Sequence, residues 1–211
     1  MTMQIVCLLF DGVTALDAIG PYEVLSRLPG ASFAFVTVDP GPARTDNNVL
    51  GLVGELTLDQ VSHADVLVVP GGPGTRRLET DDRVLDWIRA INDTTSWTTS
   101  VCTGSIVLGA AGLLKGLDAT THWNELPSLE KYGARPVARR VVEQGKIVTA
   151  AGVSAGIDMA LVLAARIAGD VVAQAIQLGI EYDPQPPFAA GSPASAPAEV
   201  VGLVREVLSA S

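Results

Sequence analysis

Two residues of this sequence have the chemistry of a nucleophile and its proton-transfer partner. The first is Cys102, which separates the β-rich run Ser96–Val101 from a stretch of small and apolar residues that begins at Gly104. A side chain at such a strand-to-helix corner stands above the sheet, as in a nucleophile elbow. The helix N-terminus brings backbone N–H groups and partial positive charge close to the sulfur. We therefore expect the pKa of the thiol to be lowered, which favours the nucleophilic thiolate.

Asp17 is the expected acid/base partner, with Asp11 as its rival. Asp17 lies in an apolar stretch (TALDAIGP), just before a helix that Pro21 helps to start. In a desolvated pocket that also holds a thiolate, its pKa would rise, so it could hold a proton near neutral pH. The alternative role for Asp17 is an N-cap of that helix.

The remaining cysteine and the two histidines favour structural roles. Cys7 lies inside an apolar strand and is interpreted as a buried hydrophobe. His63 lies in a polar segment expected at the surface, and His122 at a helix start, where a structural hydrogen bond is favoured over ligand contact. Two Cys and two His give no disulfide framework and no multi-His metal pattern, so we do not expect a multi-His metal centre. Chemistry at a cysteine nucleophile needs neither a metal nor an organic cofactor, and none is expected.

A third candidate loop is Gly71-Gly72, which ends the apolar run Asp65–Pro70. Backbone N–H groups without side chains in the way can form half of an anion-stabilising hole, with the N–H of Thr103 as the other half. The Lys-Ser/Thr of a phosphate loop is absent, and no GxGxxG opens a helix.

Short β-rich runs alternate with helical patterns, which predicts a mostly parallel, doubly wound α/β sheet with active-site loops at its carboxyl edge. The expected strands are Met3–Phe10, Ser32–Asp39, Asp65–Pro70, Ser96–Val101 and two runs within Arg139–Thr149 around the turn at Gln144-Gly145. The expected helices are Ala18–Leu28, Leu78–Asn92, Gly104–Leu114, Ala155–Ala168, a helix that Asp170 caps, and Ala198–Leu208. Pro21 is tolerated best in a first turn, so regular helix is expected from about Gly20. Asp46–Asn48 predicts a small hairpin at a sheet edge.

Length and composition bound the remaining possibilities. The 211 residues suit one domain, with the Pro-rich stretch 183–197 as a strap and the last helix packed on the body, so that 183–211 belongs to the same domain. A net charge of −9 disfavours nucleic-acid binding. No apolar run is long enough to span a membrane, and the N-terminus lacks the features of a leader peptide, so a cytoplasmic location is expected.

Four segments carry a resemblance to a known family: LLFDGVTALDAIGPYEVL, VLVVPGGPGTRRL, SVCTGSIVLGAAGLLKGLDATTHW and VVEQGKIVTAAGVSAGIDMAL. With them the chain resembles the ThiJ/PfpI group of the glutamine-amidotransferase-like superfamily along essentially its whole length. The elbow VCTGS, the following ATTHW and the tail EYDPQPPFAAGSPASAPAEVV are most similar to the isocyanide hydratases.

The resemblance implies a flavodoxin-like three-layer sandwich and a homodimer with active sites near its interface. It implies an acidic residue from the first βα region beside the cysteine, the position that Asp17 occupies. The implied reaction is hydration of an organic isocyanide to an N-substituted formamide through a thioimidate on Cys102, with Thr103 and the backbone of Gly72 orienting the substrate.

The pocket for an apolar isocyanide is expected to be lined by Trp123, Ile157 and Phe188. Gly152 is also expected to contact substrate. It follows Ala150-Ala151, where some hydratases have a run of glycines, and the two methyl groups are expected to stiffen the entry to the next helix.

Two alternatives stay open. A non-catalytic ligand sensor or thiol redox switch would resemble the amidotransferase-like part of AraC-type regulators, which share VCTG and ATTHW. The sequence ends at Ser211, so no helix-turn-helix region is expected. A glyoxalase or deglycase is disfavoured because Thr103 stands where such relatives place His.

Overall fold

The structure is a computed structural model that describes residues 2–209. The chain divides into two compact units, one ending at Ile180 and the other beginning at Glu181. All of the candidate residues named above except Phe188 belong to the first unit.

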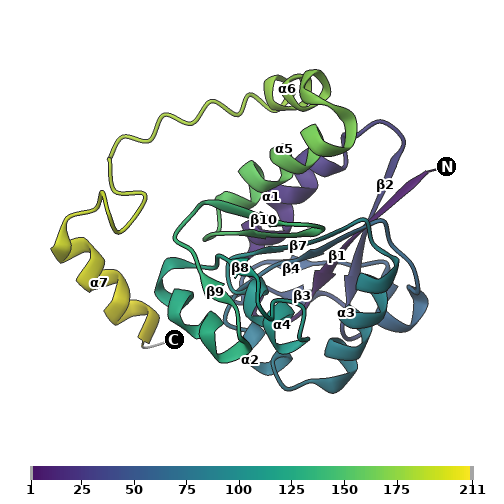
Figure 1. Cartoon of the computed structure of the whole chain (residues 1–211), viewed down its shortest axis with the longest axis horizontal. Helices are drawn as coiled ribbons and strands as arrows, with labels where there is room; N and C mark the ends of the chain where they lie inside the picture. The colour runs from purple at the N-terminus through teal and green to yellow at the C-terminus, as the bar shows by residue number, and fades with distance from the viewer. Residues whose placement is uncertain (1, 210–211) are drawn as a thin grey trace. The chain divides into compact units, whose positions relative to one another are not determined.

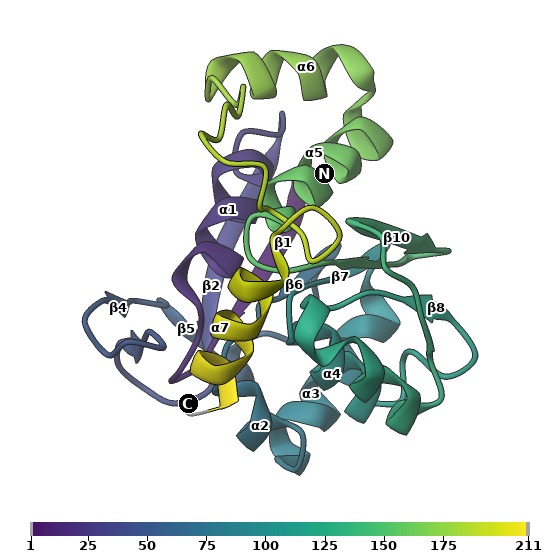
Figure 2. The same cartoon turned by 90° about the vertical axis from the view of Figure 1, so that its left-hand side faces the viewer.

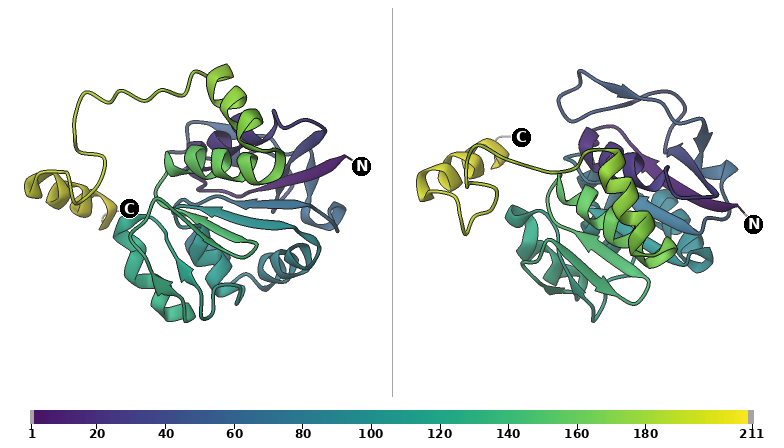
Figure 3. Two further views of the ribbon diagram at one scale, coloured as in Figure 1. Left: turned by 45° about the horizontal axis from the view of Figure 1, so that its top comes forward. Right: turned by 90° about the horizontal axis from the view of Figure 1, so that it is seen from above.

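A seven-stranded sheet forms the centre of the described part of the first unit, in the order β10-β11-β7-β6-β1-β2-β5. The strands are β1 (Met3–Leu9), β2 (Ala31–Thr37), β5 (Leu56–Thr57), β6 (Val66–Val69), β7 (Trp97–Val101), β10 (Val141–Gln144) and β11 (Ile147–Ala150). Neighbouring strands are parallel except β10, which pairs antiparallel with β11 (Figure 3). The predicted turn at Gln144-Gly145 joins that pair, and the predicted sheet is confirmed.

Helices cover both faces of the sheet, as the alternating pattern predicted. The helices are α1 (Ala15–Leu25), α2 (Thr75–Leu78), α3 (Asp82–Thr94), α4 (Gly104–Ala110), α5 (Ala155–Ala168) and α6 (Asp170–Gly179), with 3-10 turns η1 (Leu58–Gln60) and η2 (Trp123–Tyr132). Figures 1 and 2 show α1 and α5 on one face and α3 and α4 on the other. The three-layer α/β sandwich is therefore confirmed.

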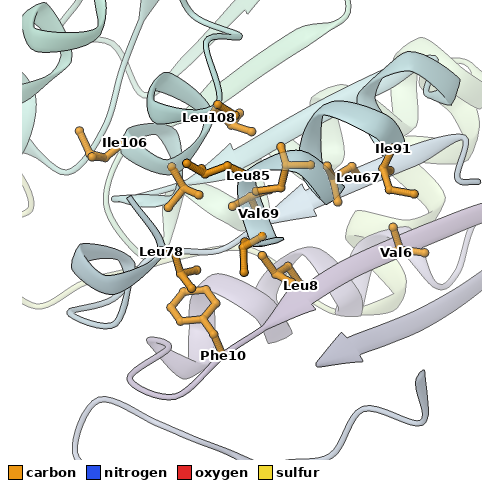
Figure 4. Close-up of a cluster of buried hydrophobic side chains, with 14 of the residues drawn as sticks. Val6, Leu8, Phe10, Leu67, Val69, Leu78, Leu85, Ile91, Ile106 and Leu108 are labelled. Carbon is orange, nitrogen blue, oxygen red and sulfur yellow. The ribbon is translucent and has the colours of Figure 1, made fainter. Parts of the chain in front are cut away.

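Strand β1 shows how the sequence builds these layers. Alternate side chains of a strand point to opposite faces. The even-numbered apolar residues from Val6 to Phe10 enter the cluster on the side of α3 and α4, where they meet Leu67 and Leu85 (Figure 4). The odd-numbered residues from Ile5 to Leu9 enter the cluster on the side of α1 and α5. A strand that is apolar on both faces is thus buried on both faces.

Helix α1 corrects the expectation of a helix that begins near Gly20. It begins at Ala15, and Pro21 lies inside it. A proline inside a helix lacks the N–H that would bond the carbonyl four residues earlier, here that of Asp17. Burial of Val24 and Leu25 against the sheet and α5 offsets this local cost, because tertiary packing contributes more than helix propensity. The early start places Asp17 within the helix rather than at its cap.

Other boundaries and one strand pairing also differ from the prediction. The single helix expected over Leu78–Asn92 is divided into α2, which ends at Leu78, and α3, which begins at Asp82. Helix α4 ends at Ala110 instead of Leu114, and Gly169 rather than Asp170 is the N-cap of α6. The predicted hairpin around Asp46–Asn48 forms, but β3 (Ala43–Arg44) and β4 (Gly51–Leu52) make a two-stranded sheet of their own instead of an edge of the main sheet. A second small sheet pairs β8 (Asp118–Ala119) with β9 (Arg135–Pro136). Among the described residues, no helix combines the length and apolarity needed to cross a membrane.

The second unit contains helix α7 (Ala198–Ser209) after an irregular, Pro-rich stretch. The helix carries exposed apolar side chains at positions that recur on one helical face: Val200, Leu203, Val204 and Val207. The predicted terminal helix is therefore present, and its packing on the first unit stays a prediction.

Candidate active site

Cys102 stands at the corner between β7 and α4 with a left-handed backbone, φ +54°. This conformation is uncommon for a residue with a side chain and marks a strained turn. Two hydroxyl groups hold its carbonyl oxygen, that of Thr121 at 2.8 Å and that of Ser105 at 3.1 Å. Its own N–H donates to the carbonyls of Ala150 and Ala151 at 3.1 and 3.0 Å. The corner predicted from VCTGS therefore has the geometry of a nucleophile elbow.

Glycines allow the loops of the site to approach one another. A β-carbon on Gly104 would lie 2.0 Å from the carbonyl oxygen of Val69, and one on Gly71 would lie 2.5 Å from the nitrogen of Thr103. Gly72 has φ +130° and lies against the backbone of Gly12. Real β-carbons do not tolerate such contacts, so the three carboxyl-edge loops can meet only because these positions lack side chains.

Gly71 and Gly72 use their N–H groups within the protein. The Gly71 N–H donates to Oδ2 of Asp17 at 3.0 Å, and the Gly72 N–H donates to the hydroxyl of Thr103 at 2.9 Å. The sequence suggested that these donors would face an anionic intermediate. In the structure they position the carboxyl group and the threonine that flank the nucleophile.

Asp17 lies beside Cys102, and its side chain is fully buried. One carboxyl oxygen, Oδ2, accepts from Gly71, whereas the other, Oδ1, is buried and has no hydrogen-bond partner among the described atoms. The carboxyl group as a whole also interacts with the Cys102 thiol. The N-cap alternative is not met, because Thr14 is the cap and Asp17 donates its own N–H to the Thr14 carbonyl. A buried carboxyl group that interacts with a thiol is suited to proton exchange with it.

Burial raises the pKa of the Asp17 carboxyl to about 7, as expected from the sequence. The N–H of Gly71 and the Cys102 thiol oppose this shift by stabilising the carboxylate, and the negative charge of Asp46 adds to it. The carboxyl group is therefore close to half-protonated at neutral pH, where a general acid/base is most effective.

The pKa of the Cys102 thiol is raised, whereas the sequence led us to expect a lowered pKa. Burial, followed by repulsion from the charge of Asp17, raises its pKa to about 12. The N–H groups of Thr103 and Val153 and the Thr103 hydroxyl bond the sulfur and act in the opposite direction, but they do not outweigh burial. The helix N-terminus alone therefore does not produce a resting thiolate, and the thiol needs a base as it reacts.

Val153 is a contributor that the sequence did not reveal. It has φ +32°, and its N–H bonds the Cys102 sulfur. A β-branched residue is disfavoured in the left-handed region, so no propensity rule would place such a donor here. The neighbouring residues Ser154 and Ala155 predicted only the start of a helix.

The expected substrate-binding residues have different surroundings. Gly152 adjoins Val153, and a β-carbon on it would meet Cδ2 of His122 at 2.7 Å. His122 caps η2 through its Nδ1, and the ring centroids of His122 and Trp123 are 5.5 Å apart. Ile157, on the first turns of α5, packs against Gly20 of α1. Phe188 lies in the second unit.

The rival candidates lie elsewhere. Asp11 is exposed and accepts the backbone N–H of Arg44 at 2.8 Å. The His63 side chain is 54% exposed and lies 3.7 Å from Asp65 ahead of β6, near the amino edge of the sheet. Cys7 is fully buried in β1, and burial raises the pKa of its thiol strongly. Asp17 and Cys102 are thus the pair that the fold brings together.

Metal-ligating side chains do not gather within residues 2–209, where no group of three or more His, Cys, Asp or Glu could hold an ion.

Comparison with known proteins agrees with this geometry. The DJ-1/PfpI family matches residues 3–166. The isonitrile hydratase of Pseudomonas putida is 46% identical over 206 residues, which cover 98% of this chain and 90% of the relative. The crystal structure of a ThiJ/PfpI family protein from Pseudomonas syringae superposes with a TM-score of 0.95 at 37% identity, covering 99% of this chain and 87% of that one.

A transcriptional regulator is also similar. CdhR of Pseudomonas aeruginosa, of the HTH type, is 29% identical over 168 residues, which cover 78% of this chain but only 49% of the regulator. The family match over most of the sequence and the two close relatives nevertheless agree on one assignment. This chain is a member of the DJ-1/PfpI family.

Proposed function

We propose that this protein hydrates organic isocyanides to N-substituted formamides, with Cys102 as nucleophile and Asp17 as acid and base. The similarity to an isonitrile hydratase over nearly the whole chain supports the substrate class. The observation that carries the mechanism is the buried carboxyl group of Asp17, which interacts with the Cys102 thiol and has one oxygen without a hydrogen-bond partner among the described atoms.

The first step joins the sulfur to the terminal carbon of R–N≡C. The thiol proton moves to the Asp17 carboxylate as the carbon–sulfur bond forms, and the protonated carboxyl then delivers it to the same carbon. The carbon–nitrogen triple bond becomes a double bond, and the product is the thioimidate R–N=CH–S on Cys102. A carboxyl group with a pKa of about 7 suits both transfers.

The second step hydrolyses the thioimidate. Asp17 takes one proton from water while the oxygen forms a bond to the carbon, and it passes that proton to nitrogen. The carbon–sulfur bond then breaks, the remaining hydroxyl proton returns to sulfur, and R–NH–CHO leaves. The N–H groups of Thr103 and Val153 stabilise the sulfur as it gains negative charge.

The test uses an alkyl isocyanide with the wild-type protein and two alanine variants. Cys102→Ala is expected to abolish formamide production, whereas Cys7→Ala should retain it, because the Cys7 thiol is fully buried within β1 and inaccessible to substrate. Mass spectrometry after brief exposure should find the adduct on Cys102 and none on Cys7. Turnover by Cys102→Ala at the wild-type rate would refute the mechanism.

A ligand sensor is the second candidate, favoured by the similarity to part of an HTH-type regulator. It predicts that the isocyanide binds without conversion. A steady-state formamide assay beside a calorimetric titration distinguishes the two, since saturable binding with no product would support the sensor.

A further inference from the structure

Arg140, which precedes β10, is bonded to the segment that carries Val153. Its carbonyl accepts the N–H of Ala151 at 2.9 Å. Its guanidinium forms an ion pair with Asp158 through Nε and donates to the hydroxyl of Ser154 at 3.2 Å. One arginine therefore bonds the backbone and one side chain of the turn that leads into α5, together with a side chain in the first turn of that helix.

That same turn contacts the nucleophile at two points. Ala151 accepts the N–H of Cys102 through its carbonyl at 3.0 Å, so a single peptide segment joins the Arg140 carbonyl to the backbone of Cys102. Val153 donates its N–H to the sulfur from a left-handed conformation, φ +32°. A strained conformation persists only where its surroundings fix it, and Arg140 supplies such a constraint.

The ion pair is not expected to contribute much to global stability. The Arg140 side chain is 50% exposed and that of Asp158 is 29% exposed, and pairs this open to solvent are strongly screened. The planar guanidinium of Arg140 can nevertheless fix the direction of the turn, because it bonds Asp158 and Ser154 in one geometry.

We propose that Arg140 is a positioning residue that holds the Ala151–Ser154 turn so that the Val153 N–H stays directed at the Cys102 sulfur. Its effect on turnover rests on the proposed hydratase function, whereas its effect on the reactivity of the thiol does not.

The same helix offers a matched control. Arg166, in the last turn of α5, pairs with Glu143 of β10 through two hydrogen bonds of 3.0 and 3.2 Å and is 57% exposed. Figures 1 and 2 show β10 beside α5. Arg166→Gln therefore removes a similar link between the same two elements, but at the end of the helix away from Cys102.

The experiment measures the rate at which iodoacetamide alkylates Cys102 between pH 6 and 10, by mass spectrometry of the Cys102 peptide. Asp17 is the charged group that faces the sulfur, and it is unchanged in all variants. Arg140→Gln is expected to slow alkylation about three- to tenfold, since a hydrogen bond to a charged group is weakened. Arg166→Gln should stay within about twofold of wild type, and both should unfold at nearly the wild-type temperature.

Equal rates in Arg140→Gln and Arg166→Gln would overturn the proposal, because the position of the link would then not matter. Arg140→Lys tests whether the geometry of the guanidinium or only its positive charge matters. Lysine keeps the positive charge but lacks the planar guanidinium, so alkylation should remain slow. Full recovery of the wild-type rate would also overturn the proposal. If Arg140→Gln does not fold, Ser154→Ala takes its place, with slower alkylation expected and an unchanged rate contrary to the proposal.

Formamide production with an alkyl isocyanide is measured on the same samples. A wild-type protein that makes no formamide would end the proposed function, yet the alkylation rates would still decide the role of Arg140.

Discussion

The carboxyl of Asp17 and the thiol of Cys102 are both withdrawn from water, which makes both harder to ionise, and the negative charge of Asp17 makes ionisation of the thiol harder still. Because the negative charge of Asp17 opposes a second charge on sulfur, the pair is expected to lose its protons in two separated steps. The form with one proton between the two groups can react, since transfer of the thiol proton to Asp17 creates the thiolate and the acid together.

That shared proton predicts how activity depends on pH. The one-proton form appears as Asp17 ionises, so kcat/KM for isocyanide hydration should rise with pH and level off above about 7. The thiol, with a pKa near 12, gives no descending limb below pH 9. The measurement is initial rate against pH from 5 to 9. A flat profile would contradict the assignment of Asp17 as base.

The same carboxyl group predicts a conflict between stability and activity. Its pKa rises from 3.8 to about 7 on folding, so the native state binds the extra proton between these values and loses stability as pH increases through them. Asp17→Asn should therefore be more stable than wild type at pH 8, by about 2–4 kcal/mol, and differ little at pH 4. It should also lose activity. Urea unfolding at both pH values tests this, and equal differences at pH 4 and pH 8 would argue against a raised pKa.

At the scale of elements, the site depends on how closely three loops approach at the carboxyl edge of β1, β6 and β7. Gly104 opens α4 in direct contact with the end of β6, and Gly71 separates Thr103 from Asp17. The register of the sheet sets where each loop begins at the carboxyl edge, and the glycines set how closely the loops approach one another. None of these strands and loops is unusual by itself, and the surroundings of Cys102 form only where they come together.

Gly104→Ala tests this close approach. Its β-carbon would meet the Val69 carbonyl at 2.0 Å, and backbone cannot move aside as a flexible side chain can. We expect a loss of roughly 3 kcal/mol or more in the free energy of unfolding. In the control, Gly179→Ala, the new methyl group meets nothing within 4 Å, and the change should stay within about 1 kcal/mol. Similar unfolding midpoints for the two variants would count against the packing argument.

At the scale of the whole molecule, the apolar core lies entirely in the first unit. All three clusters of buried apolar side chains among the described residues fall before Glu181. The second unit offers one helix of 12 residues, about the length at which isolated helices are marginal in water.

A chain of residues 1–180 is therefore expected to unfold cooperatively, and a peptide of residues 181–211 to show little helix. Circular dichroism with thermal unfolding measures both. A lower midpoint for 1–180 than for the full chain would support the expected packing of 183–211 on the body, and a non-cooperative transition would contradict an independent first unit. Sedimentation of the full chain tests the homodimer implied by the family resemblance.

Sequence alone determined the layers of the fold and the position of the candidate nucleophile. The runs at Met3–Phe10 and Asp65–Pro70 are apolar on both faces, which only a covered parallel sheet satisfies, and VCTGS at a strand end gives Cys102 its corner. These inferences depend on local periodicity and residue type, which a sequence carries explicitly. The start of α1 could not be read in this way, because packing against α5 and the sheet outweighs the local cost of Pro21.

Tertiary structure decided which groups surround the sulfur and whether it is ionised. The N–H of Val153 at the sulfur and the hydroxyl of Thr121 at the Cys102 carbonyl come from separate parts of the chain, and no spacing rule brings them to Cys102. The raised pKa of the thiol likewise reflects burial, which depends on every element packed around it. Proximity and desolvation are properties of the folded chain, so only the folded structure specifies them.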